Sequence, residues 1–291
     1  MTDTFNLMLS SAVFYGIKSQ KEDHMALITM NYYSAKLNGN QEIGIILPDC
    51  PYFADPRKFY ESGKKYKVLW LLHGTFGDYS DWIRKSMIEL YACEKELIVV
   101  MPSASNSVYE NWPDMMLGYN FWDYFFEELM PMIYNWFPAS DKKEDNYVAG
   151  LSMGGRGTMK FVCGHPELFA GAAILSSCPR DLKKEMEEFR DNPVMYKRML
   201  NDIERCGGVE QYLQSNENTW EHCRTLVNNP EAPILYFCCG EDDHSIANFR
   251  KFEEYARQIG LEATFETEPG YQHEWRFWDR YIQKALKFFE L

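Results

Sequence analysis

Apolar positions along the chain gather into short runs separated by polar segments. Eight runs have the length and composition of strands: 26–33, 42–47, 67–72, 97–101, 147–149, 171–175, 234–239 and 263–268. Helix-like patterns fill most gaps from the third run onward: 82–93, 121–136, 154–163, 248–259 and 275–289. Alternation of short apolar strands with helices predicts an α/β fold with a mostly parallel, eight-stranded sheet covered on both faces.

The first two runs are separated only by the tetrapeptide Leu-Asn-Gly-Asn at positions 37–40. Asn-Gly is a strong signal for a tight turn between strands. We therefore expect the chain to open with an antiparallel hairpin.

One stretch, about 179–229, interrupts the strand–helix rhythm with charged, helix-forming sequence and no strand. It is longer than an ordinary crossover, so we expect a helical cap insertion over the carboxyl end of the sheet. There is no Pro/Gly/Ser-rich linker and no internal repeat, which indicates one domain over 25–291. Residues 1–24 form an N-terminal arm that packs either on this body or on a neighbouring subunit, which leaves a homo-oligomer open.

Composition excludes several classes of partner. The 291 residues carry a formal net charge of −13, which disfavours binding to nucleic acid and to anionic membrane surfaces. No apolar run approaches the roughly 20 residues of a membrane span. The start lacks the basic segment of a secretory signal, so we predict a cytoplasmic protein. The eight cysteines include no Cys-x-x-Cys pair, and we interpret all of them as reduced.

The pentapeptide Gly-Leu-Ser-Met-Gly at 150–154 carries the chemistry. It has the form G-x-S-x-G and stands between a predicted strand and a predicted helix. This is the nucleophile elbow, in which a tight strand-to-helix turn exposes a strained serine. Ser152 is the predicted nucleophile.

A serine nucleophile needs a histidine base and a carboxylate that orients it. In this architecture the acid follows the seventh strand and the histidine the eighth. Of six histidines, His273 lies in the loop after the last strand and is the predicted base. The loop after 234–239 offers three adjacent acids, of which we choose Asp243 and keep Asp242 in reserve. His244 leaves from the wrong strand and is interpreted as a pocket or capping residue.

The oxyanion hole requires backbone N–H groups beside the nucleophile. One donor should be Met153, which follows the serine, and the other Thr75, in the His-Gly-Thr-Phe-Gly loop after the third strand. His73 in that loop is expected mainly to shape the backbone, and it is also a candidate for contact with substrate. Trp112 follows the fourth strand and either walls a substrate pocket or packs under the cap.

With these residues in place, the chain resembles the esterase D group of α/β-hydrolases, especially tributyrin esterases and cinnamoyl (feruloyl) esterases. The similarity begins near residue 25, does not include residues 1–24, and rests on these segments: 25–34 with 47–48, 71–77 with 81–82, 99–102, 127–129, 149–155, 239–243, and 273–275 with Trp278. The Gly-x-x-Asp pattern of the family falls on Gly240 and Asp243. The resemblance implies hydrolysis of carboxylic esters through an acyl-enzyme, with no metal and no organic cofactor.

We therefore expect a serine carboxylesterase that acts on small-molecule esters with short-chain or aryl groups, including acetyl or feruloyl and cinnamoyl esters. The main alternative is an acyltransferase that passes the same acyl group to a sugar or alcohol. A non-catalytic binding module on a hydrolase scaffold is a third class, which the intact set of Ser152, Asp243 and His273 argues against.

Overall fold

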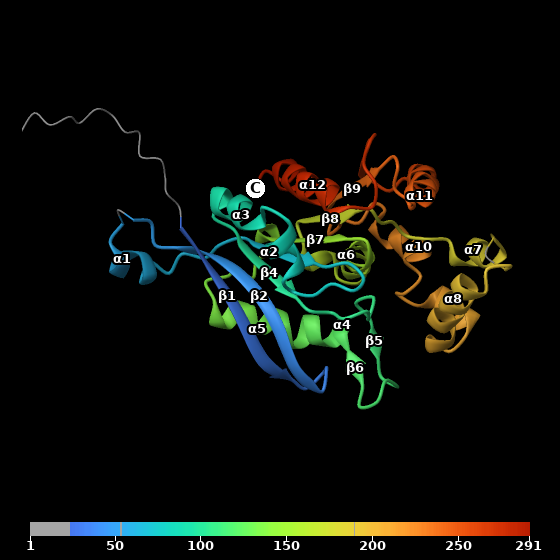
Figure 1. Ribbon diagram of the computed structural model, residues 1–291, viewed down its shortest axis with the longest axis horizontal. Coiled ribbons are helices and arrows are strands. Elements are labelled where there is room, and N and C mark those ends of the chain that lie inside the picture. Colours follow the sequence, from blue (N-terminus) through green and yellow to red (C-terminus); the bar gives the residue numbers. More distant parts are fainter. Residues whose placement is uncertain (1–23, 53, 189) are drawn as a thin grey trace, which may run out of the picture.

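In the computed structural model, which describes residues 24–52, 54–188 and 190–291, eight strands form one sheet in the order β1-β2-β4-β3-β7-β8-β9-β10 (Figure 1). They are β1 (His24–Ser34), β2 (Gly39–Asp49), β3 (Val68–Leu72), β4 (Ile98–Pro102), β7 (Asn146–Leu151), β8 (Gly171–Leu175), β9 (Ile234–Gly240) and β10 (Thr264–Glu268). All pairs from β4 to β10 are parallel, and the pairs β1–β2 and β2–β4 are antiparallel. This confirms the predicted fold. Apart from His24, the predicted N-terminal arm lies outside the described residues.

The opening hairpin is confirmed, with Ser34 paired to Gly39 across the turn. Asn38 takes a left-handed backbone with a φ of 52°, which asparagine tolerates better than most residues. Glu128, from a helix under the hairpin, accepts hydrogen bonds from the Ser34 hydroxyl at 2.5 Å and from the amides of Ala35 and Lys36 at 3.1 Å. The turn is thus fastened to the body.

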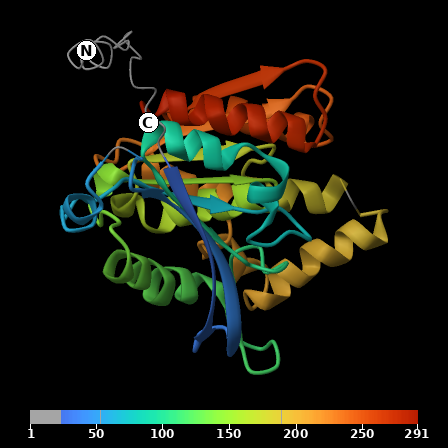
Figure 2. The ribbon, with the colours of Figure 1, turned by 60° about the vertical axis from the view of Figure 1, so that its left-hand side comes forward.

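Helices cover both faces of the sheet. One face carries α2 (Asp81–Lys85), α3 (Ile88–Lys95) and α12 (Trp275–Phe288). The other carries α4 (Phe121–Asp123), a π-helical segment (Tyr124–Leu129), α5 (Met130–Trp136), α6 (Met153–Gly164) and α11 (Ile246–Ile259). Figure 2 shows α12 and α3 on one side of the strands and α5 on the other. None of the helices in the described part of the chain unites the length and apolar character needed to cross a bilayer.

Some elements differ from the sequence prediction. The single helix predicted over 82–93 is two, because the backbone of Ser86 is extended between α2 and α3. The short helix α1 (Pro56–Tyr60) and the small hairpin β5 (Asn111–Trp112) and β6 (Tyr119–Asn120) carry too few residues for a periodic pattern to reveal. The remaining short segments are 3₁₀ turns at Lys143–Asp145, Pro166–Leu168 and Cys223–Leu226.

The segment predicted as an insertion is helical. After β8 it forms α7 (Leu182–Glu188), α8 (Pro193–Arg205), α9 (Val209–Gln214) and α10 (Thr219–His222). It has a small apolar cluster of its own, made by Leu182, Met199, Ile203 and Tyr212. In Figure 1, α7 and α8 stand at the edge of the molecule beyond the carboxyl ends of the central strands.

A fully buried asparagine organises the amino end of the central strand β7. The side chain of Asn146 accepts hydrogen bonds from Trp70 Nε1 at 3.0 Å and from the Tyr134 hydroxyl at 2.9 Å. Its amide nitrogen donates to the carbonyls of Ser140 at 2.9 Å and Lys142 at 2.8 Å. One amide thus satisfies four polar groups from different parts of the chain.

We expect Asn146→Ala to lower the free energy of unfolding by about 3 kcal/mol or more, because it leaves several buried donors and acceptors without partners. Chemical denaturation measures this. Asn135→Ala is the control, since Asn135 is exposed and bonds only the carbonyl of Pro131 within its own helix. Its expected effect is within about 0.5 kcal/mol. Similar losses in both variants would contradict the role given to Asn146.

Candidate active site

Ser152 stands in the turn between β7 and α6 with a strained backbone. Its φ of 52° and ψ of −115° are unfavourable for a residue with a side chain. The turn is held on both sides: the Ser152 amide donates to the carbonyl of Leu175 on β8 at 2.9 Å, and its carbonyl accepts from the Arg156 amide at 3.2 Å. This is the backbone geometry that the elbow motif predicts.

Two glycines make this turn sterically possible. A Cβ on Gly150 would lie 2.4 Å from the backbone of Gly154, so the strand and the helix could not come this close. A Cβ on Gly154 would lie 2.5 Å from the carbonyl oxygen of Leu72 on β3. The glycines at both ends of the motif are therefore required by backbone contacts.

Asp243 and His273 meet although thirty positions separate them in the sequence. The Nδ1 atom of His273 lies 2.8 Å from Asp243 Oδ2. Gly240 makes the approach possible, because a Cβ there would lie 2.2 Å from the carbonyl oxygen of Tyr271 in the loop that carries His273. The Asp242 amide donates to the same carbonyl at 3.1 Å.

The Asp243 side chain is completely buried, whereas Asp242 is exposed. Burial by itself would raise the pKa of Asp243. Hydrogen bonds from His273 and from the amide and hydroxyl of Ser245 outweigh it and lower the pKa to about 2. The carboxylate is therefore ionised at neutral pH and aimed at the imidazole. This geometry favours Asp243 over its neighbour as the acid.

Two aromatic side chains surround the imidazole of His273. The ring of Trp278 meets it edge to face with centroids 5.0 Å apart, and Trp278 Nε1 donates to the Ser176 hydroxyl at 3.0 Å. Ser176 directly follows Leu175, which accepts the Ser152 amide. A continuous set of contacts therefore links the base to the nucleophile. The second is His244, with its ring centroid 4.5 Å from that of His273 and its side chain 77% exposed.

Sequence reasoning gave no role to Ser245 or Trp278. Ser245 has a recognisable signal, because an Asp-x-Ser step allows the serine to bond the carboxylate two residues earlier. Trp278 has as its signal its inclusion, with 273–275, in the resemblance to the esterase D group.

The loop after β3 forms a turn closed by a hydrogen bond from the Gly77 amide to the Gly74 carbonyl at 3.1 Å. The first residue of the turn lies against the nucleophile, since a Cβ on Gly74 would be 3.6 Å from Ser152 Cβ. Phe76 has a φ of 65°, and its amide is already bonded to Asn106 Oδ1 at 2.9 Å. Thr75 lies between Gly74 and Phe76 in this turn, and its amide stays the predicted oxyanion donor together with that of Met153 at the start of α6.

His73 is buried, with 1% of its surface exposed. Its Nε2 accepts from the Ala104 amide at 2.8 Å, and its Nδ1 donates to the Gly74 carbonyl at 2.7 Å. Burial lowers its pKa, which keeps the ring neutral. With both nitrogens bound to backbone groups, the ring ties the oxyanion loop to the loop after β4. This favours the shaping role over contact with substrate.

Trp112 is half-buried on β5, beside a cavity of about 340 Å³ lined by Ser105, Asn106, Ser107, Trp112, Met115 and Tyr119. Its Nε1 donates to the Ser107 carbonyl at 2.8 Å. Since Asn106 also bonds the oxyanion loop, the cavity lies next to that loop. Its lining combines polar side chains with apolar and aromatic ones, which suits an organic group of moderate size.

In the described part of the chain, one set of side chains could in principle hold a metal ion. Asp243, His244 and His273 place their ligand atoms within 4.8 Å of one another. The set includes the predicted acid and base, and Asp243 Oδ2 is already bonded to His273 Nδ1. The set therefore coincides with the pair predicted to carry proton transfer.

Comparison with known proteins agrees with this geometry. The family model described as "Putative esterase" matches residues 34–289. The chain belongs to this esterase family. An acetyl esterase from Caldicellulosiruptor saccharolyticus is 27% identical over 275 residues, which cover 90% of this chain and 97% of that protein.

Two solved structures from Staphylococcus aureus resemble this esterase over 91% of its chain. An S-formylglutathione hydrolase is 30% identical, with a TM-score of 0.73 and 99% of its own chain covered. A fluorophosphonate-binding serine hydrolase is 28% identical, with a TM-score of 0.74 and 98% covered. The protein is thus an enzyme, a serine hydrolase of the esterase type with an α/β-hydrolase fold.

We expect Asp243→Asn to lower kcat by on the order of 10⁴, because an amide cannot hold the imidazole in the required tautomer. Asp242→Asn is the matched control one residue away and should keep kcat within about twofold of wild type. Steady-state kinetics with p-nitrophenyl butyrate measures both. If the two variants rank in the opposite order, Asp242 is the acid.

His73 should make stability depend on pH. Its pKa is lower in the folded protein than its ordinary value of 6.5, so the unfolded chain binds the proton more readily. Stability from this group is therefore present above pH 6.5 and is lost as the pH falls below it. Denaturant titrations between pH 7.5 and pH 5 should show a smaller decline for His73→Gln than for wild type. Parallel declines would contradict a neutral buried imidazole.

Proposed function

We propose that this esterase hydrolyses short-chain or aryl carboxylic esters through an acyl-enzyme, with Ser152 as nucleophile, His273 as base and Asp243 as acid. The observation that carries the proposal is the 2.8 Å hydrogen bond between His273 Nδ1 and buried Asp243, at the same end of the sheet as the strained serine. Fixing Nδ1 as the donor leaves Nε2 as the acceptor for the serine proton.

In the first half-reaction, Ser152 Oγ attacks the ester carbonyl carbon as its proton passes to His273 Nε2. The charge that develops on the carbonyl oxygen is stabilised by the amides of Met153 and Thr75. Collapse of the tetrahedral intermediate breaks the bond to the alcohol oxygen, which leaves with the proton from His273. Water then attacks the acyl-enzyme through the same steps, which releases the carboxylic acid product and restores Ser152.

The proposed substrate class rests on the cavity beside the oxyanion loop. Trp112, Met115 and Tyr119 provide apolar and aromatic surface, and about 340 Å³ accommodates a short acyl chain or an aryl ring. The similarity to an acetyl esterase over nearly the whole of both chains supports the short-chain end of this range.

A second candidate is hydrolysis of a small thioester. It is favoured by the 30% identity to an S-formylglutathione hydrolase. The same acyl-enzyme chemistry applies, with a thiol as leaving group. The candidates differ in the group that departs, so they can be separated by assay.

We expect Ser152→Ala to abolish turnover of p-nitrophenyl acetate and to prevent labelling by a fluorophosphonate, while the thermal unfolding transition remains. The residual rate should be at least about 10³-fold below wild type, because only the binding and oxyanion groups remain. A folded variant with near-wild-type turnover would contradict the role of Ser152 as the nucleophile.

The same purified enzyme should then be assayed on acetyl, butyryl and feruloyl esters and on S-formylglutathione. The proposal expects the highest kcat/KM on one of the three oxygen esters. A kcat/KM at least about tenfold higher on the thioester would favour the second candidate.

A further inference from the structure

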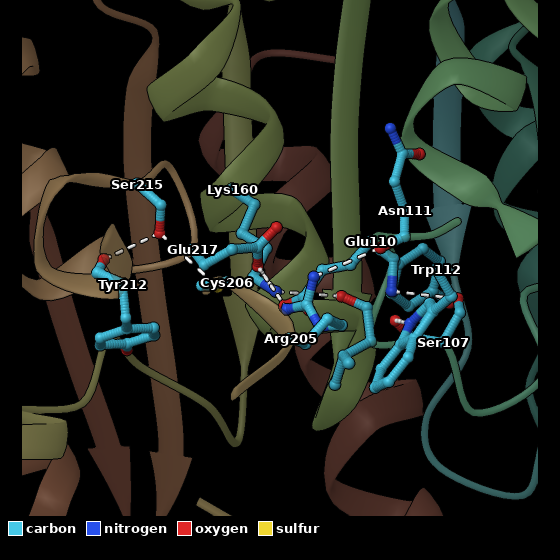
Figure 3. A network of polar contacts seen from close by, with 12 residues as sticks. Ser107, Glu110, Asn111, Trp112, Lys160, Arg205, Cys206, Tyr212, Ser215 and Glu217 are labelled. Atoms are coloured by element: carbon cyan, nitrogen blue, oxygen red, sulfur yellow. Dashed lines mark hydrogen bonds and ion pairs between the residues drawn. The ribbon is translucent and has the colours of Figure 1, made fainter. Parts of the chain in front are cut away.

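Four charged side chains meet at the contact between the helical insertion and the rest of the domain (Figure 3). Glu110 follows β4, and Lys160 lies on α6, the helix that begins after the nucleophile. Arg205 ends α8, and Glu217 lies between α9 and α10 of the insertion. Glu110 and Lys160 each expose only 2% of their side chains, Arg205 13% and Glu217 20%.

The pairing is crossed and balanced in charge. Arg205 of the insertion forms an ion pair with Glu110 of the body, and Lys160 of the body lies 2.7 Å from Glu217 of the insertion. Lys160 also pairs with Glu110, and Arg205 lies 3.5 Å from Glu217. Burying charged side chains removes them from water, which is costly. Such a cluster therefore forms only when each charge meets an opposite charge across the contact. The four side chains therefore fix the position of the insertion on the body.

Arg205 also contacts the wall of the cavity. One guanidinium nitrogen donates to the carbonyl of Asn111 at 3.3 Å, and the guanidinium carbon lies 4.7 Å from the centre of the Trp112 ring. An arginine stacked on an aromatic face in a partly buried setting restricts the ring to one orientation. Trp112 also lines the cavity beside the oxyanion loop.

The loop between β4 and β5 needs external support. Val108 and Tyr109 both have left-handed backbones, with φ values of 52° and 62°, which are unfavourable for residues of this size. Lys160 donates to the Val108 carbonyl at 3.3 Å, and the Tyr109 hydroxyl donates to the His73 carbonyl at 2.8 Å. The cation of α6 thus holds this loop at Val108, and Arg205 holds Asn111, which begins β5 directly after the loop.

We propose that Arg205 is a positioning residue that sets the substrate specificity of this esterase through Trp112. By stacking on the indole and anchoring Asn111, it holds the aromatic wall at a fixed distance from the oxyanion loop. Esters with a large or aryl group contact this wall extensively, whereas the small acetyl group fits the cavity whichever way the indole is held. This inference rests on the proposed function and identifies Arg205 as the residue through which the insertion affects substrate specificity.

The test uses Arg205→Met combined with Glu217→Gln. The double variant removes both partners that the insertion supplies and leaves the neutral Lys160–Glu110 pair in the body, so no unbalanced charge is buried. KM and kcat are measured for p-nitrophenyl acetate and p-nitrophenyl ferulate. We expect KM for the feruloyl ester to rise about tenfold with kcat nearly unchanged, and kcat/KM for the acetyl ester to stay within about twofold of wild type.

Arg224→Met is the matched control. Arg224 belongs to the same insertion, pairs with Glu221 at 2.9 Å and lies 5.3 Å from the Tyr255 ring, but it is exposed and away from the cavity. The Arg224→Met variant should keep the ratio of kcat/KM for the feruloyl ester to kcat/KM for the acetyl ester at the wild-type level. Arg205→Lys keeps the charge but loses the planar stacking, and it should fall between wild type and the double variant.

A double-mutant cycle with Trp112→Phe tests whether Arg205 acts through the indole. If it does, replacing Arg205 lowers kcat/KM for the feruloyl ester by a factor that is at least about threefold smaller in the Trp112→Phe background than in the wild-type background. Additive effects would contradict the mechanism. Equal losses on both esters, or an unchanged ratio in a folded variant, would overturn the proposal.

Fluorophosphonate labelling and thermal unfolding of every variant separate the two levels of inference. If wild type labels at Ser152 and hydrolyses esters but the ratio does not depend on Arg205, only the role of Arg205 fails. If wild type hydrolyses neither ester, the proposed function itself fails. If the double variant does not fold, Arg205→Lys decides: a wild-type ratio in that variant overturns the proposal, and a lowered one supports it.

Discussion

The close contact among β7, α6 and β3 at the nucleophile is the constraint on which the rest of the site depends. Ser152 holds a backbone conformation that its side chain disfavours, and only tight packing on both sides maintains it. Gly150 and Gly154 allow that packing, because a Cβ on either would collide with backbone. The strain directs the hydroxyl out of the sheet, and the same contact brings the oxyanion loop beside it.

Around this turn, polar side chains are held in place by defined hydrogen-bond partners. Buried Asp243 accepts from Ser245 and His273, which keeps it ionised and leaves the imidazole a single orientation. His73 is held neutral by burial and bridges two loops through backbone bonds. Because these side chains are preorganised, little rearrangement is needed when charge develops during acyl transfer.

The buried ion cluster extends the same principle to the insertion. Crossed pairing of Arg205 and Glu217 with Glu110 and Lys160 gives a charge-balanced contact that tolerates only one register. Such a cluster contributes less to stability than apolar packing of equal volume would, since desolvating charges is costly. Its effect is to fix where Trp112 lies. Substrate preference and the position of the insertion are thereby coupled in this esterase.

The sequence by itself determined the strand–helix alternation, the opening hairpin and the elbow, because each depends on neighbours within a few residues. It also singled out His273 by its place after the last strand, and left Asp242 beside Asp243. The sequence preferred Asp243, by its loop and by the Gly-x-x-Asp pattern of the resemblance, but the physical difference between the two acids came only from the tertiary structure, because burial and the approach of the Tyr271 loop over Gly240 are properties of distant segments. The ion cluster was likewise not predicted from the sequence. Lys160 lies in the helix predicted over 154–163, and its partners lie 50 and 57 positions away along the chain, at Glu110 and Glu217. Long-range pairing has no local signal, so folding alone decides it.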